Sequence, residues 1–294
     1  MKKNLPGLKF IDKKMLVFKY ESESGCITIE RKDVSFKDGM LEKLTDYHFH
    51  IGQFNEIYYD AHELFGLIES TQGETCVMEI RYSSTSSCRD DAELRLVEEE
   101  IAYAQAYESD SICARPYLWF IPKYAEQGIS VESAASSFDY CGIKLHPAGQ
   151  IWDDGNSVHL NALRQIFEWA DDNKKFVLIH CGPQMCDLPT RFESFFSEYS
   201  NARIILAHSN PVKETVEMVN KYKNVFCDTA CVKEKKLEIL KEKICDKSKI
   251  LFGSDFPTTH YFSTHLFGKN VSLKEQYLLD VANIQYIMKN TNRS

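Results

Sequence analysis

Short apolar runs recur along most of this chain and alternate with segments of helical periodicity. Between the runs, apolar residues at helical spacing predict helices over residues 91–107, 159–170, 211–222, 233–244 and 272–289. Short apolar strands that alternate with helices are typical of βαβ units and a parallel sheet. Eight such runs follow position 46, at residues 47–51, 76–80, 117–121, 141–145, 176–180, 203–208, 225–228 and 250–255.

Eight repeats of a strand and a helix predict an α/β fold, a (β/α)8 TIM barrel, over residues 44–294. A doubly wound open sheet is the structural alternative, and periodicity alone does not separate the two. The first 43 residues differ from the rest. Two β-prone runs, 15–20 and 26–30, surround a turn-like stretch at 22–25 and predict a small N-terminal β appendage.

Composition limits the class of protein. The chain has 294 residues and a formal net charge of −8, and an acidic balance argues against a general nucleic-acid or anionic-membrane binder. No apolar run approaches the roughly 18–20 residues that span a bilayer, and the start has no apolar signal region. The ten cysteines include no CxxC pair. We therefore expect a cytoplasmic protein with reduced thiols, no nucleic-acid partner and no membrane partner.

Polar residues fall where the predicted strands end. In a barrel, catalytic groups sit at the C-terminal ends of the strands, on the face that carries the βα loops. Six of the eight runs carry or end beside a titratable side chain, whereas the second and third runs offer less. These side chains are His48, His50, Lys144, His146, His180, His208, Asp228 and Asp255.

The first run, DYHFHIG, places His48 and His50 one residue apart. Residues i and i+2 of a strand share a face about 6.6–6.8 Å apart, so both rings can point into the barrel and bind one metal ion, while Phe49 points outward. A lone histidine after an apolar run is more often a hydrogen-bonded structural residue. Burying this many polar groups without partners would be costly, however, and a metal ion would satisfy them together.

The complete set resembles the signature of the amidohydrolase superfamily: HxH on the first strand, Lys on the fourth, His on the fifth and sixth, and Asp on the eighth. The segments that look most like its branch of metal-dependent hydrolases are GIKLHP at 142–147, VLIH at 177–180 and ILFGSDFP at 250–257. That branch is related to the aminocarboxymuconate semialdehyde decarboxylases. The resemblance covers roughly residues 44–290, and the N-terminal appendage matches nothing recognisable.

The resemblance implies an enzyme that activates a metal-bound water. Its expected metal ligands are His48, His50, His180 and Asp255, and the expected ion is one divalent metal, Zn²⁺. In such enzymes Asp255 would also accept the proton of the water and pass it to the leaving group. His208 would polarise the substrate carbonyl or stabilise the oxyanion.

Lys144 leaves several roles open. In binuclear members of the superfamily a carboxylated lysine on the fourth strand bridges two ions, and His180 and His208 would then hold the second ion. The alternatives are an ammonium that binds a substrate carboxylate, or an ion pair with Asp228. We favour an unmodified catalytic Lys144 and a single ion.

His146 and Asp228 are candidate substrate-binding residues. His146 shares the inward face with Lys144, so it can line the substrate pocket or support a ligand by a hydrogen bond. Asp228 can shape the pocket or orient a metal ligand.

The leading function is hydrolysis of a C–N or C–O bond, in an amide, ester or lactone, of a small carbonyl substrate. The alternative is a non-oxidative, metal-dependent decarboxylase of a small carboxylic acid. A TatD-type nuclease is a minor alternative, because that family carries a metal-bridging Glu where this chain has Lys144. A catalytically silent barrel would be expected to have lost ligands. The expected partner is a small-molecule substrate, and a homo-oligomer stays open.

Overall fold

The computed structural model describes residues 14–21, 26–33, 43–72, 77–89 and 92–281. Their main sheet has nine strands in the order β11-β10-β9-β8-β7-β6-β5-β3-β4. Neighbours pair in parallel, except that β4 runs antiparallel to β3. The strands are β3 (Lys43–Phe54), β4 (Ile57–Tyr59), β5 (Val77–Ser84), β6 (Ile112–Trp119), β7 (Gly142–Leu145), β8 (Phe176–His180), β9 (Arg203–Ala207), β10 (Val225–Asp228) and β11 (Ile250–Leu251).

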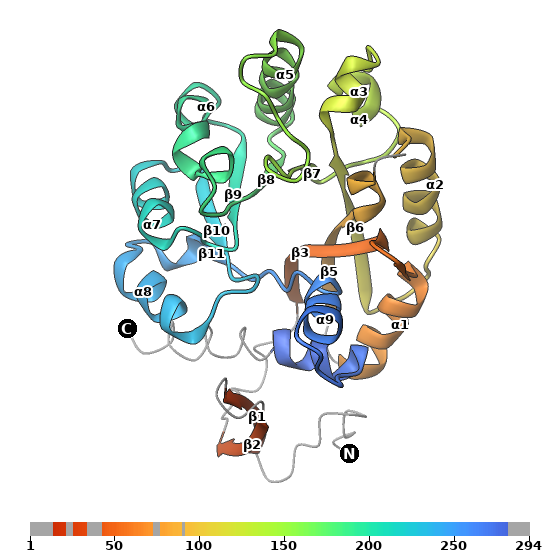
Figure 1. Ribbon diagram of the computed structural model, residues 1–294, viewed down its shortest axis with the longest axis vertical. Coiled ribbons are helices and arrows are strands. Elements are labelled where there is room, and N and C mark those ends of the chain that lie inside the picture. The colour runs from red at the N-terminus through yellow and green to blue at the C-terminus, as the bar shows by residue number, and fades with distance from the viewer. Residues whose placement is uncertain (1–13, 22–25, 34–42, 73–76, 90–91, 282–294) are drawn as a thin grey trace.

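The sheet curls until its two ends meet (Figure 1). The chain after β11 runs beside β3: the Tyr47 N–H donates to the Phe252 carbonyl at 2.9 Å, and the Asp255 N–H donates to the His48 carbonyl at 2.7 Å. The eight parallel strands, β3 and β5 to β11, correspond to the eight apolar runs. The predicted (β/α)8 barrel is confirmed.

Helices surround the sheet (Figure 1). Phe49 points outward into this layer, as predicted, and its ring centroid lies 6.3 Å from that of Phe65 on the first helix. The helices are α1 (Ala61–Gln72), α2 (Leu94–Gln105), α3 (Pro122–Glu126), α4 (Val131–Ala135), α5 (Ser157–Asn173), α6 (Glu193–Glu198), α7 (Val212–Lys221), α8 (Glu234–Lys243) and α9 (Thr258–Tyr261), with shorter turns η1 (Thr85–Cys88), η2 (Met185–Asp187), η3 (Pro189–Phe192), η4 (Lys247–Lys249) and η5 (Phe262–Leu266).

Helical residues resume at 273, and the predicted helix over 272–289 lies outside the described residues beyond 281. Among the helices described, none combines the length and the apolar character that crossing a bilayer requires.

The N-terminal β appendage is also confirmed. β1 (Lys14–Glu21) and β2 (Cys26–Asp33) pair in antiparallel register and form a two-stranded sheet of their own. A domain boundary at residue 43 remains a prediction.

The barrel interior is filled near the N-terminal ends of the strands. A small cluster of buried residues there includes Tyr117, Phe176 and Leu178, and Tyr47 packs against it. The guanidinium carbon of Arg81 lies 4.5 Å from the ring centroids of both Tyr47 and Phe176. Because these side chains fill one end of the barrel, a functional site can lie only at the opposite end, where the strands finish.

Gly142 allows β7 and β8 to approach closely. A Cβ at this position would lie 2.3 Å from the carbonyl oxygen of Phe176, which belongs to the backbone of the neighbouring strand. Because a backbone strand cannot move aside cheaply, we expect Gly142→Ala to lower the free energy of unfolding by about 3 kcal/mol. Denaturant unfolding measures the change. Gly66→Ala, whose Cβ would meet nothing nearer than 3.6 Å, is the control, and equal midpoints for the two variants would contradict the prediction.

Candidate metal centre

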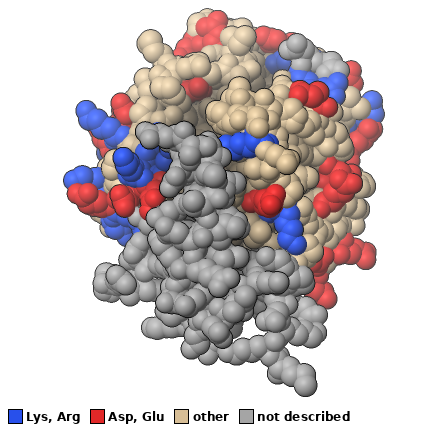
Figure 2. Space-filling view, turned by 60° about the horizontal axis from the view of Figure 1, so that its bottom comes forward, with Lys and Arg blue, Asp and Glu red and all other residues tan. Residues whose placement is uncertain are grey.

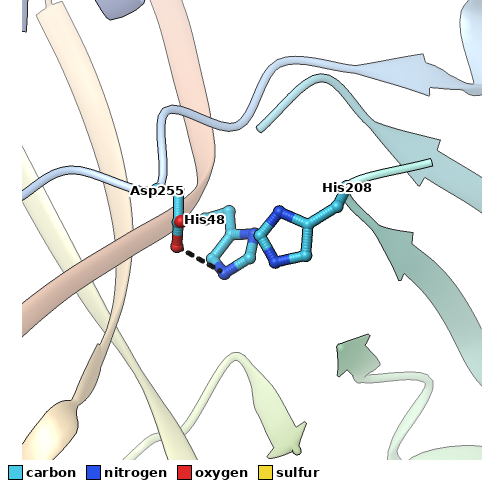
Figure 3. A group of neighbouring side chains, drawn as sticks. All are labelled: His48, His208 and Asp255. Carbon is cyan, nitrogen blue, oxygen red and sulfur yellow. Dashed lines mark ion pairs between the residues drawn. The ribbon is translucent and has the colours of Figure 1, made fainter. Parts of the chain in front are cut away.

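Three side chains that lie on or shortly after different strands point toward one another at the C-terminal end of the barrel (Figure 3). His48 lies on β3, His208 directly follows β9, and Asp255 follows β11. Each offers a ligand atom, and these atoms all lie within 4.8 Å of one another. The arrangement brings together residues that are up to about two hundred positions apart in the sequence.

His50 and His180 flank this group on two sides. His50 Nε2 lies 3.1 Å from Asp255 Oδ1, and His180 Nδ1 lies 3.1 Å from His208 Nε2. The predicted ligands are therefore neighbours in one continuous chain of contacts. The tightest group contains His208, to which the sequence assigned a catalytic role, whereas His50 and His180 contact it from either side.

The proton on His48 can be placed from its partners. Its Nδ1 lies 2.8 Å from Asp228 Oδ2, and a carboxylate only accepts, so Nδ1 carries the proton and Nε2 carries a lone pair. Lys144 Nζ donates to this lone pair at 2.9 Å. Burial first, and Lys144 second, hold the pKa of His48 well below its usual value, so the ring is neutral. A neutral imidazole whose other nitrogen donates to a carboxylate is the usual form of a metal-binding histidine.

His208 is constrained in the same way. Its Nδ1 lies 3.2 Å from the carbonyl oxygen of Ala230, which only accepts, so in the neutral form of this ring the lone pair lies on Nε2. In that form His208 can accept a hydrogen bond or bind a cation through Nε2.

Asp228 is fully buried and supports the site from below. Its Oδ1 accepts the backbone N–H groups of His208 at 2.7 Å and Ala230 at 3.1 Å, while Oδ2 accepts from His48. Of the roles that the sequence left open, this geometry favours orientation of a ligand, because no part of the carboxylate is exposed to a substrate.

Negative charge exceeds positive charge at this centre. The buried carboxyl groups of Asp228 and Asp255 act on the buried ammonium of Lys144, and the buried carboxyl group of Asp46 accepts the backbone N–H of His48. Burial raises the pKa of Asp46 to about 7 and that of Asp228 to about 6. Asp46 Oδ2 has no hydrogen-bond partner within the described part of the chain.

The excess of acceptor groups also appears in the distance between two individual atoms of the centre. His48 Nε2, whose lone pair accepts from Lys144, also lies 3.3 Å from Asp255 Oδ1, so two acceptor atoms lie next to each other. A cation between them would relieve both. Imidazole nitrogens and carboxylate oxygens are ligands that divalent transition metals accept, and the residues present therefore fit a metal ion.

Asp255 and His208 both occupy the left-handed region of backbone conformation, with φ of +57° and +63°. Only a few per cent of residues other than glycine do so, and such strain concentrates at functional sites. Burial opposes the ionisation of Asp255, but His48 and a hydrogen bond from His50 outweigh it and hold its pKa well below the ordinary range. Asp255 is therefore an ionised carboxylate at neutral pH.

Two contacts of the site escaped the sequence analysis. Ser83 Oγ lies 3.1 Å from His50 Nδ1, and Cys231 Sγ donates to Asp255 Oδ2 at 3.3 Å. Ser83 was missed because the second run was placed at 76–80, whereas β5 continues through Ser84. Cys231 lies beyond the seventh strand, where no pattern marks it.

Solved structures of known proteins share the architecture. A TatD family hydrolase from Entamoeba histolytica is 10% identical, with a TM-score of 0.52, and the match covers 85% of this chain and 95% of that one. An amidohydrolase II is 16% identical, with a TM-score of 0.49 over 84% of this chain and 100% of that one. A dihydroxybenzoic acid decarboxylase from a Polaromonas species, with bound manganese and an inhibitor, is 13% identical, with a TM-score of 0.43 over 86% and 98%. At these identities the likeness concerns the fold alone.

Sequence comparison identifies the family. No curated protein matches the chain. The family model described as amidohydrolase matches residues 126–291, more than half of the 294 residues. The matched segment includes Lys144, His180, His208 and Asp255, and the His48–His50 pair lies before it. The chain belongs to the amidohydrolase family.

Proposed function

We propose that this protein is a metal-dependent hydrolase that uses water to cleave a C–N or C–O bond of a small carbonyl compound. The observation that carries the proposal is the convergence of His48, His208 and Asp255 at the C-terminal end of a closed barrel. This is the end at which barrel enzymes hold their active sites. Membership of the amidohydrolase family supports an enzyme without selecting the reaction.

His48, His208 and Asp255 would hold the ion, with His50 and His180 close enough to join them. Zinc is the proposed metal, because the ligands are nitrogen and oxygen atoms. A divalent ion in such a site supplies Lewis acidity and lowers the pKa of a bound water to about 7.

Asp255 is the proposed proton acceptor. Its low pKa keeps it ionised at neutral pH, and Oδ1 faces the centre while the Cys231 thiol holds Oδ2. After accepting the proton of the attacking water, the carboxylic acid would deliver it to the leaving amine or alkoxide. The backbone hydrogen bond from the Asp255 N–H to the His48 carbonyl holds this residue against β3.

Lys144 is proposed to act as an unmodified ammonium. It is buried, and burial lowers its pKa from the usual value. Its acceptor is the lone pair of His48 that a cation would also use. An ion bound there would leave the Lys144 ammonium available to a substrate oxygen.

A decarboxylase remains the second candidate. The buried ammonium of Lys144 at the centre is suited to a carboxylate, which a decarboxylase must bind. Both reactions would use the same ligands, so the products distinguish them: carbon dioxide in one case, and an amine or alcohol in the other.

A nuclease has less support. Basic and acidic side chains are interspersed over the described part of the face shown in Figure 2. The formal net charge of −8 also opposes a polyanionic substrate, because binding of the phosphate backbone depends on clustered Lys and Arg. We therefore propose a small-molecule substrate.

Elemental analysis of the purified native protein by ICP mass spectrometry tests the proposal. We expect about one equivalent of a divalent metal, loss of activity on chelation and recovery on re-addition. About two equivalents would instead favour a carboxylated Lys144. A protein that binds no metal after attempted reconstitution would overturn the proposal, and assays of released carbon dioxide, amine and alcohol on a panel of small carbonyl compounds separate the two reactions.

A further inference from the structure

His146 lies just beyond β7, and its proton can be placed from the backbone around it. The N–H of Gly149 donates to His146 Nδ1 at 3.0 Å. A backbone N–H requires a lone pair as its acceptor, so Nδ1 carries no proton. The neutral ring therefore carries its proton on Nε2, and Nε2 is a hydrogen-bond donor.

The donor of His146 is available at the site. The ring stacks on His180 with centroids 3.8 Å apart and planes 10° apart, which places it beside the candidate metal ligands. The Trp119 ring is parallel to it within 2°. The side chain is partly exposed, and no described residue accepts a hydrogen bond from Nε2.

Hydrogen bonds hold in place the loop after β7, whose Gly149 N–H determines which nitrogen of His146 carries the proton. The Gln150 N–H returns to the His146 carbonyl at 3.2 Å, and the Ala148 N–H donates to Asp187 Oδ1 at 2.9 Å. A Cβ on Gly149 would lie 2.8 Å from His146 Nδ1, so only glycine lets the ring keep its position. The backbone therefore specifies both the tautomer and the location of the ring.

The N–H groups of the other rings of the centre are already directed at acceptors: that of His50 at Asp255 Oδ1, and that of His180 at His208 Nε2. The lone pairs of His48 and His208 lie on Nε2, the atom that each directs toward the centre. A carbonyl or carboxylate oxygen on a substrate is an acceptor and needs an N–H. Apart from the Lys144 ammonium, His146 Nε2–H is the N–H beside these rings that has no acceptor among the described residues.

From this geometry we infer that His146 contacts the substrate and donates its Nε2–H to an oxygen next to the bond that breaks. The inference rests on the proposed function and deepens it: the substrate carries a carbonyl or carboxylate oxygen at this position and not an ammonium group. His146 then has the role of polarising the carbonyl, which the sequence assigned to His208.

The tautomer can be observed directly. In zinc-loaded protein with ¹⁵N-labelled histidine, long-range ¹H–¹⁵N spectra should show, among the Nε2–H rings, a neutral one whose signals are absent from His146→Gln. Acetate is the probe for an acceptor oxygen, and methylammonium is a probe of equal size without one. We expect acetate to shift the His146 Nε2 proton signal and methylammonium to leave it unmoved.

Two variants of His146 distinguish the effect of its N–H donor on acetate binding from the effect of ring stacking. His146→Phe keeps a flat ring for stacking and should weaken acetate binding about tenfold or more, whereas His146→Gln retains an N–H donor and should weaken it less. Gly149→Ala should displace the ring signal and weaken acetate binding, while Gly66→Ala should do neither. Dissociation constants come from the shifts of the remaining histidine signals, and thermal melting checks that each variant is folded.

An Nδ1–H or doubly protonated His146, or equal acetate affinity in native and His146→Phe protein, would overturn the inference. Metal content distinguishes this from failure of the proposed function. If the protein binds its metal and His146 does not respond to acetate, only the inference fails; if it binds no metal, the proposed function fails.

Discussion

Asp255→Asn should lower kcat/KM at least about a thousandfold, equivalent to roughly 4 kcal/mol of transition-state stabilisation. Asparagine has nearly the same size, but its amide cannot take a proton from the attacking water. The fold should survive, because asparagine tolerates the left-handed backbone that Asp255 adopts, with φ of +57°. Steady-state kinetics on the substrate found by the product assays measure the loss, together with the melting temperature.

Asp139→Asn is the matched control for this substitution. The side chain of Asp139 is 79% exposed and pairs with Lys175 at the surface, far from the centre in its contacts. We expect this variant to keep native kinetics. A loss of less than tenfold in Asp255→Asn, with its metal retained, would remove Asp255 from the role of proton acceptor.

His48→Ala/His50→Ala should reduce bound metal to below about a tenth of the native content and activity by at least about a thousandfold. The substitution removes one member of the three-ligand cluster and the ring that contacts Asp255. It also leaves the carboxylates of Asp228 and Asp255 without these imidazole partners. ICP mass spectrometry after gel filtration measures the metal.

Two further variants, one expected to weaken metal binding in part and one expected to leave it unchanged, test the same prediction. Asp228→Asn keeps all the rings but weakens the orientation of His48, and a loss of ten- to a hundredfold in metal affinity is typical of such partners. His265→Ala, in which the replaced side chain is 39% exposed, should bind metal as the native protein does. Native metal content in the double variant would show that the ion, if present, lies elsewhere.

The barrel could be predicted because its strands are buried on both faces. Each parallel strand then reads as a continuous apolar run, and β8 and β9 match the predicted runs closely. Boundaries were less accurate where other residues interrupt the apolar pattern. β6 begins at Ile112, five residues before the predicted run, because Arg115 and Pro116 interrupt the apolar pattern.

The members of the candidate site followed from one rule, that polar residues at the ends of parallel strands meet. The chemical role of each residue did not follow from this rule. The tautomer of His208 depends on the carbonyl of Ala230, and that of His146 depends on the N–H of Gly149. Backbone groups are the same in every residue, so the sequence carries no signal of which ring they meet. In our proposals the role of polarising the carbonyl therefore passes from His208 to His146, and His208 becomes a metal ligand.

The packing of Arg81 against Tyr47 and Phe176 has a consequence for the entry of substrate and the release of product. Because these side chains fill the N-terminal end of the barrel, we expect substrate to enter and product to leave by the same route, at the end that carries the βα loops. Bound product then prevents the next substrate molecule from binding, and analogues of the product should be competitive inhibitors.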